Sequence, residues 1–195
     1  PDAAHIQYAN GLVKATITTA DIFTLSEIDK LVEKAETVDP MIQPIMVGGE
    51  KKYVLLLHPY QVTDMRTNVS TGQWADIQKA AAAAQGQGNP IFTGALGEYR
   101  GVVMHSHRNV VRFSDYGSGT NLPAARALFL GAQAAAIAFG NGGGESVARY
   151  SWKEELFDYG NQLGVAAGCI FGVKKTRFNS ADFGVIALDT YAIAH

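Results

Sequence analysis

The sequence predicts an α+β fold from three observations. Residues 24–38 have the apolar spacing of an amphipathic helix, residues 53–57 form an apolar run of strand length just before Pro59, and residues 150–178 combine aromatic side chains with spaced glycines. The 195 residues are 47% hydrophobic and 17% charged, as in a well-buried globular protein. A chain of this length fits one large domain or two small ones.

The amphipathic helix follows a segment, residues 11–19, whose alternation suits a short strand. Thr24 stands three residues before Glu27, which is the spacing of a capping box at a helix N-terminus. Apolar residues then recur at helical spacing, at Leu25, Ile28, Leu31, Val32, Ala35 and Val38. We expect the helix to end before Asp39-Pro40, because the residue before a proline is pushed out of the helical region.

A buried strand that leads into a surface helix comes next. The apolar run at residues 53–57 contains aromatic and branched side chains, as expected for a strand buried on both faces. Residues 45–47 and the Gly48-Gly49 pair predict a tight hairpin into this strand. Pro59 suits the first position of a helix, because that position needs no amide donor.

The middle of the chain combines a helical segment with glycine-broken strands. Residues 73–84 contain an alanine run that favours a helix. Residues 91–113 predict strands, and residues 114–123 have the composition of a loop. Residues 124–139 are apolar and alanine-rich, and their pattern fits either a buried helix or a strand followed by a helix.

The last quarter of the chain predicts mainly strands. The glycines at residues 141–144 permit a sharp bend. Residues 150–178 predict long, twisted strands whose glycines let two backbones approach closely. Two short apolar runs, residues 185–187 and 191–193, predict a final pair of strands.

Charge, cysteine content and hydropathy exclude several classes of protein. A formal charge of −2 argues against charge-driven binding of nucleic acid, which needs clustered Lys and Arg. Cys169 has no partner for an intrachain disulfide, and its apolar neighbours predict an inert, buried thiol in a reducing cytosol. No apolar stretch reaches membrane-spanning length. Because the sequence opens at Pro1 rather than Met, we expect a fragment or a processed product.

Three histidines are the candidate metal ligands. His105 and His107 lie two residues apart, and with His58 they would supply three nitrogen ligands. No Asp, Glu or Cys accompanies them at a known ligand spacing, so we interpret His105 and His107 as a solvated pair near a strand end. We therefore expect no metal, no cofactor and no catalytic residue.

The remaining polar clusters also favour structural roles. Glu154, Glu155 and Asp158 are interpreted as a charged strand edge, which discourages unwanted pairing. The glycine-rich segments lack the flanking residues of phosphate-binding loops and are interpreted as turns. Lys174, Lys175 and Arg177 form the one basic cluster of the sequence. Three interpretations stay open for it: a contact with DNA, a contact with a neighbouring subunit, or a solvated strand face.

Three motifs resemble a known family. They are the His58-Pro59 junction, the segment from Phe92-Thr93-Gly94 to Gly101-Val102-Val103, and the run at residues 174–179. Together they resemble the major capsid proteins of tailed bacteriophages, in the N-four-like branch of the Hong Kong 97 fold. The likeness covers nearly the whole chain, and none of the motifs is a catalytic signature.

The resemblance implies two domains. A peripheral domain, with a spine helix and long β-strands, would comprise residues 1–40 and 146–180, with the spine helix at residues 24–38. An axial α/β domain would comprise residues 41–145 and 181–195. The family's N-terminal arm and most of its extended loop have no counterpart in this sequence, so the chain is expected to be a C-terminal portion.

The resemblance also implies the function. Copies of the protein would form pentamers and hexamers of an icosahedral shell around double-stranded DNA, with portal, scaffolding or decoration proteins as further partners. The shell would assemble in the bacterial host cytoplasm and form the virion capsid, without catalysis and without a membrane. Two alternatives stay open: an encapsulin-like compartment shell, and a small metal-dependent enzyme that uses His58, His105 and His107.

Overall fold

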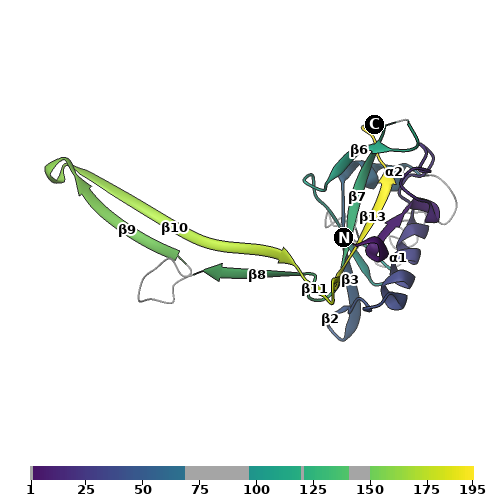
Figure 1. The fold of residues 1–195 in the computed structure, drawn as a ribbon, viewed down its shortest axis with the longest axis horizontal. Coiled ribbons are helices and arrows are strands. Elements are labelled where there is room, and N and C mark those ends of the chain that lie inside the picture. Colours follow the sequence, from purple (N-terminus) through teal and green to yellow (C-terminus); the bar gives the residue numbers. More distant parts are fainter. Residues whose placement is uncertain (1, 69–96, 120, 141–149) are drawn as a thin grey trace, which may run out of the picture. The chain divides into compact units, whose positions relative to one another are not determined.

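The chain forms two compact units, which are described separately. The computed structural model describes residues 2–68, 97–119, 121–140 and 150–195 (Figure 1). The first unit, here called the core unit, comprises Pro1–Ala134 and Arg177–His195. The second, here called the hairpin unit, comprises Ala135–Thr176. The predicted helix at residues 73–84 and the predicted bend at residues 141–144 lie outside the described residues.

The core unit contains an eight-stranded mixed sheet. Its main order is β1-β13-β7-β3-β5-β4, while β2 pairs with β3 and β6 pairs with β7. Strand β3 is parallel to β5 and antiparallel to β7. The strands are β1 (Ile6–Tyr8), β2 (Ile45–Val47), β3 (Glu50–Leu57), β4 (Glu98–Tyr99), β5 (Val102–Ser106), β6 (Arg112–Tyr116), β7 (Leu122–Leu130) and β13 (Val185–Tyr191). A separate two-stranded ladder joins β11 (Arg177–Phe178) to β12 (Ala181–Asp182).

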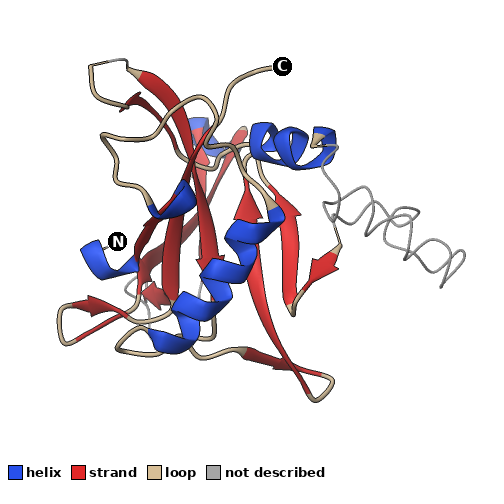
Figure 2. Cartoon of the chain, turned by 90° about the vertical axis from the view of Figure 1, so that its right-hand side faces the viewer, coloured by secondary structure: helices blue, strands red, loops and turns tan. Residues whose placement is uncertain are grey.

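Two helices complete the core unit. Helix α1 (Leu25–Thr37) lies across one face of the sheet, and α2 (Pro59–Thr67) follows directly after β3 (Figure 2). Short 3-10 turns at Ala3–His5 and Ala9–Gly11 flank β1. The apolar side of α1 and the sheet face beneath it form one buried cluster, which includes Ile28, Leu31, Ala35, Leu55, Leu57, Met104, Phe129 and Ile186.

The predicted capping box at the start of α1 is wrong, although the predicted helix itself is confirmed. Thr24 is the N-cap residue, but its side chain accepts no capping hydrogen bond. Glu27 is almost completely buried and instead accepts hydrogen bonds from the Asn10 backbone N–H (3.1 Å) and from Gln7 Nε2 (3.2 Å). The N-terminal segment thus uses the carboxylate that the box would have required.

A capping box occurs at α2 instead. His58 Nδ1 accepts a hydrogen bond from the Tyr60 backbone N–H (3.2 Å), and Gln61 Oε1 accepts one from the His58 backbone N–H (3.0 Å). Pro59 occupies the first helical position, as predicted. His58 therefore ends β3 and starts α2, and its ring nitrogen satisfies an amide that would otherwise lack a partner.

The strands of the core unit confirm some predictions and correct others. The β2–β3 hairpin is confirmed, but only one face of the predicted strand at residues 53–57 is buried, while Val54 and Leu56 on the other face are partly exposed. Residues 11–19 form turns rather than a strand. Residues 114–116 belong to β6 rather than to a loop. The chain ends with the single strand β13 rather than with a pair, because Ala192 and Ile193 follow its end.

The hairpin unit confirms the predicted long strands. It contains β8 (Ala135–Gly140), β9 (Tyr150–Phe157) and β10 (Gln162–Lys175), joined between β9 and β10 by the turn Asp158–Gly160. One half of β10 pairs with β9 and the other half with β8, both antiparallel. At about 3.3 Å per residue, β10 spans roughly 46 Å. Both halves of residues 124–139 are therefore strands, and the helix alternatives for that segment are wrong.

The hairpin unit is an insertion between two neighbouring strands of the core sheet. Leu130 at the end of β7 pairs with Val185 at the start of β13, and the Gly131 N–H donates to the Gly184 carbonyl at 2.9 Å. The compact units therefore have other boundaries than the expected domains. Residues 1–40, including α1, belong to the same unit as residues 41–134 and not to that of the long strands.

Candidate assembly surface

The sheet of the hairpin unit has one strongly apolar face. Residues directly opposite each other on antiparallel strands project to the same side, so the register assigns each side chain to a face. The face here called the apolar face carries large side chains that are 42% to 69% exposed: Ile137, Phe139, Tyr150, Trp152, Leu156, Leu163, Val165, Phe171 and Val173. Its aromatic members include Phe139 and Phe171, whose ring centroids lie 6.5 Å apart.

The opposite face consists mainly of glycine, alanine and polar residues. It carries Gly164, Ala166, Gly168 and Gly172 of β10, together with Lys153 and Glu155 of β9. A Cβ at Gly164 would lie 2.4 Å from the ring of Phe157, so glycine is needed where that ring covers the backbone. The two faces thus differ in the size of their side chains as well as in polarity.

The apolar face exceeds what a single folded subunit ordinarily leaves in water. Of nineteen large hydrophobic side chains exposed among the described residues, twelve belong to the hairpin unit and nine of these lie on the apolar face. A contiguous apolar patch larger than a few hundred Å² usually marks an interaction site. The alternation of large and small residues along residues 162–173 is a signal in the sequence that would have identified this face, and the sequence reasoning did not use it.

The expectation that Cys169 is buried is wrong. Its side chain is exposed on the apolar face, opposite Tyr150. Its apolar neighbours belong to an exposed strand rather than to a core, and local composition does not distinguish these two cases. The accessibility of the Cys169 thiol to a reagent therefore shows whether the apolar face is covered.

The basic cluster predicted from the sequence is divided between the faces and the units. Lys174 and Lys175 are consecutive residues of β10 and so project to opposite faces. Arg177 belongs to the core unit, where its side chain donates to the Ser180 carbonyl and its Nε lies 3.6 Å from Asp182 Oδ1. A role for these residues in contacts with DNA or a neighbouring subunit stays a prediction.

The histidines have separate structural environments. His58 is buried as the cap of α2, and burial, together with the nearby charge of Arg112, lowers the pKa of its ring. His105 and His107 are exposed, and His107 Nδ1 accepts a hydrogen bond from the Asn109 N–H at 3.2 Å. Within the described ranges, no three His, Cys, Asp or Glu side chains are grouped so as to hold a metal ion.

The predicted charged strand edge is confirmed for two residues. Glu154 and Glu155 lie on β9, which is an outer strand of its sheet, while Asp158 lies in the turn that follows. Glu154 Oε1 accepts a hydrogen bond from Trp152 Nε1 at 2.7 Å. None of the three has the buried environment that would suit a catalytic acid.

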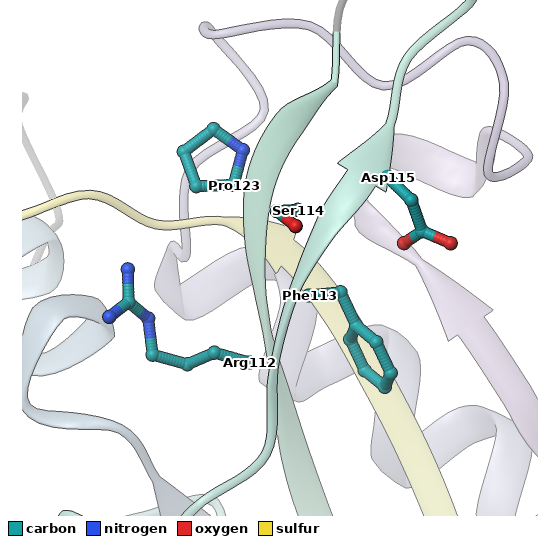
Figure 3. Close-up of a pocket in the computed structure, with 5 residues that line it drawn as sticks. All are labelled: Arg112, Phe113, Ser114, Asp115 and Pro123. Carbon is teal, nitrogen blue, oxygen red and sulfur yellow. The ribbon is translucent and has the colours of Figure 1, made fainter.

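A hollow of about 500 Å³ lies on the core unit, beside β6 and β7. Arg112, Phe113, Ser114, Asp115 and Pro123 line it, and Arg112 and Phe113 point away from each other (Figure 3). The Arg112 guanidinium lies 4.6 Å from the centroid of the Tyr60 ring. The hollow is open and shallow, and it offers an exposed cation rather than an enclosed reaction site.

A buried ionic network links β6, β7 and β13 of the core sheet, and it was not predicted from the sequence. Asp189 of β13 accepts hydrogen bonds from Tyr116 (2.6 Å) and from Arg126 Nε and Nη2 (2.7 and 2.6 Å). Burial and the hydrogen bond to Asp189 raise the pKa of Tyr116. The hydrogen bond to Asp189 raises the pKa of Arg126, so both groups keep their protons at neutral pH. These residues are far apart in the sequence, and their pairing follows from the register of β7 with β13.

No helix in the described part of the chain is long and apolar enough to cross a membrane.

Comparisons with known proteins agree with this architecture. A family model described as "Phage capsid protein" matches residues 3–194. The major capsid protein of Pseudomonas phage KPP25 is 28% identical over 152 residues, which are 71% of this chain and 38% of that protein. The solved capsid of Ralstonia phage GP4 is 50% identical to this chain, with a TM-score of 0.77. The match covers 100% of this chain and 54% of the GP4 chain.

A second solved structure shows the fold at low sequence identity. A chain in the cyanophage Pam1 capsid asymmetric unit is 18% identical, with a TM-score of 0.78. The match covers 97% of the present chain and 54% of the Pam1 chain. The present chain thus spans about half the length of these solved capsid chains and 38% of the length of the KPP25 protein. The match confirms the expected α+β phage capsid fold, and the chain belongs to the phage capsid protein family.

Proposed function

We propose that this chain is a portion of a major capsid protein, whose copies assemble into the icosahedral head shell of a tailed phage or prophage. The observation that carries the proposal is the 50% identity to the Ralstonia phage GP4 capsid across the whole chain. The apolar face supports it, because an exposed apolar sheet of this length needs a covering surface.

The shell would consist of pentamers and hexamers that enclose double-stranded DNA without reading its sequence. A net charge of −2 supports this, because it leaves no large cationic surface to bind the genome tightly. Portal, scaffolding or decoration proteins would be further partners. Assembly would take place in the host cytoplasm, and the protein's role would be structural rather than enzymatic. The family match favours this function over an encapsulin-like compartment or a metal-dependent enzyme.

The two compact units suggest a revised assignment of the capsid domains. The core unit, with its eight-stranded sheet and two helices, would be the axial domain, and the hairpin unit would supply the long strands of the peripheral domain. Helix α1 packs against the sheet of the core unit, so the spine helix would come from another part of the complete protein. In this assignment the apolar face is covered once the complete protein has folded and assembled.

The test is to express the complete gene with its neighbouring genes and to examine the product by negative-stain electron microscopy. Closed shells of uniform size that contain DNA are the expected result. A discrete small oligomer with nearly one metal ion per chain would contradict the proposal.

A second measurement tests the apolar face in the same samples. Maleimide labelling of Cys169, located by peptide mass spectrometry, should be slow in intact shells and fast after mild dissociation. Equal labelling rates in both states would show that the apolar face stays uncovered, and the face would then have no role in assembly.

A further inference from the structure

A segment of the core unit presents basic side chains and no acidic ones. From Gly101 to Ser114 the sequence contains no Asp or Glu. Within this stretch His105, His107, Arg108 and Arg112 are all exposed, and Arg108 and Arg112 form no ion pair with another described residue. Residues 105–112 are here called the basic segment.

The basic segment is held firmly by the backbone around it. The His107 N–H donates to the Leu57 carbonyl (2.9 Å), and the Arg126 N–H donates to the Val111 carbonyl (2.9 Å). The Arg112 guanidinium lies against the Tyr60 ring, which meets the His58 ring edge-on at 4.5 Å. An arginine that is oriented on an aromatic ring but has no carboxylate partner is preorganised to bind one.

Two permanent positive charges are too few for a nucleic-acid surface. Binding to DNA strengthens with each phosphate that is neutralised, so two charges alone give only weak binding at physiological salt. A short-range contact with carboxylates on a protein surface needs only one or two arginines, because each such hydrogen bond is charge-assisted. Arg and aromatic residues are also enriched in protein interfaces.

The complementary carboxylates occur at the C-terminal end of α1. Glu33, Glu36 and Asp39 are exposed and form no ion pair with another residue in the described part of the chain. The C-terminal end of a helix carries a partial negative charge and favours cations. The charge of Arg100 in the same subunit already acts on Glu36, so a cationic partner would relieve the part of the repulsion that remains in the free subunit.

These two charged regions adjoin β3 at different places. The end of α1 adjoins the middle of β3, since the Ile42 N–H donates to the Ala35 carbonyl and Tyr53 Oη donates to the Ile42 carbonyl. The basic segment adjoins the C-terminal end of β3, at Leu57. Among the described residues, no ion pair joins the two regions of one copy.

We propose that the basic segment of one copy binds the acidic end of α1 of a second copy, in a head-to-tail contact. Two different surfaces of the same subunit that fit each other give a heterologous interface, which forms a closed ring where the rotation between successive copies closes. The inference rests on the proposed shell function, and it names the residues that would join neighbouring core units within a ring.

Charge reversal in the complete protein tests the contact. Arg108→Glu with Arg112→Glu, and separately Glu33→Lys with Glu36→Lys, should each lower the yield of sedimenting shells by about tenfold or more. The four substitutions together should restore most of the yield, because the charges then match again. Lys51→Glu is the matched control, since Lys51 is exposed and forms no ion pair with another described residue; its yield should equal that of the wild type.

The outcomes separate the contact from the function. Circular dichroism of the dissociated subunits shows whether each variant folds. The Glu33→Lys, Glu36→Lys variant should stay folded, because the favourable effect of lysines at a helix C-terminus offsets the lost attraction between Glu36 and Arg100. Normal yield from either reversed variant, or no recovery in the fourfold variant while its subunits are folded, would overturn the contact. Shells formed at normal yield but with less DNA would assign the basic segment to nucleic acid instead. If the wild type itself forms no shells, the proposed function fails, and the contact fails with it.

Discussion

The core unit and the hairpin unit use apolar residues in opposite ways. In the core unit, apolar side chains from α1, α2 and the four strands β3, β5, β7 and β13 meet in one buried cluster. In the hairpin unit, no described residue is fully buried, and large side chains cover one exposed face of the sheet. Hydrophobic burial thus stabilises the core unit within the subunit, whereas in the hairpin unit the same type of residue is exposed.

The difference shows why apolar content alone is a poor guide to subunit stability. A narrow antiparallel sheet with no packed layer is marginally stable in water, because its hydrogen bonds exchange with water at little net gain. The hairpin unit therefore lacks a packed interior among its described residues, while the core unit has one. Substitutions in the two units should accordingly act on different measurements.

The largest loss of subunit stability is expected from the core unit. Phe129 is completely buried, with its ring centroid 4.8 Å from that of Tyr53. Phe129→Ala should lower the free energy of unfolding by about 3–5 kcal/mol, because it leaves a cavity. Phe171→Ala on the apolar face is the matched control and should change it by less than about 0.5 kcal/mol. Similar losses from both variants in urea unfolding would contradict the comparison.

A smaller loss is expected from the buried ionic network. Asp189→Asn leaves Arg126 without its bidentate carboxylate, and Arg126 is 20% exposed. We expect a loss of about 2–3 kcal/mol, less than for a fully buried pair, because water still reaches the arginine. Asp115→Asn, which breaks the exposed pair with Lys14, should cost about 0.5 kcal/mol or less. Equal costs for the two pairs in thermal unfolding would show that burial does not set their strength.

The pH dependence of stability should reveal the cap of α2. Burial lowers the pKa of His58 in the folded protein, so the unfolded chain binds a proton first as the pH falls. The His58 contribution is complete above the unfolded pKa of about 6.5 and decreases as the pH drops toward the folded pKa. His58→Asn keeps a capping acceptor but does not titrate, so its free energy of unfolding should fall less between pH 7 and the lowered pKa. His58→Ala should cost about 1 kcal/mol at neutral pH. An unchanged pH profile in His58→Asn would exclude this role.

The smallest effect on the subunit is expected from the apolar face, where the effect on assembly should be large. Trp152→Ser with Phe171→Ser should change the free energy of unfolding by less than about 0.5 kcal/mol, because both side chains are exposed. The same variant should form few shells and should bind less of a hydrophobic dye as a free subunit. Normal shell yield would show that this face is not an assembly surface.

The local elements of the core unit were largely predictable from the sequence. Helix α1, the β2–β3 hairpin and the Pro59 helix start all follow from short-range patterns that the structure confirms. The helix cap was not predictable in detail, because Glu27 is bound by Gln7 and Asn10, which reach it through the tertiary fold. The choice between helix and strand for residues 124–139 likewise depended on strand partners that lie far along the chain.

The candidate assembly surface was harder to predict for a physical reason. The apolar neighbours of Cys169 indicate that the strand needs a cover, but they do not indicate whether the same subunit provides it. Lys174 and Lys175 are adjacent in sequence yet project to opposite faces of β10, so a cluster of charges in the sequence is not one patch on the molecule. The basic segment and the acidic end of α1 are separate in the sequence, and only the fold shows where each lies on the core unit.

The insertion of the hairpin unit between β7 and β13 has a consequence for how the protein can evolve. The chain leaves and re-enters the core sheet at paired residues, Leu130 and Val185, so the core strands keep their register whatever the length of the excursion. Lengthening such an excursion adds only about 0.6 kcal/mol of closure entropy for each doubling. Adding or removing two residues on each of β9 and β10 also preserves which side chains point to which face. The span of the hairpin can therefore change in paired steps, without any compensating change in the core unit.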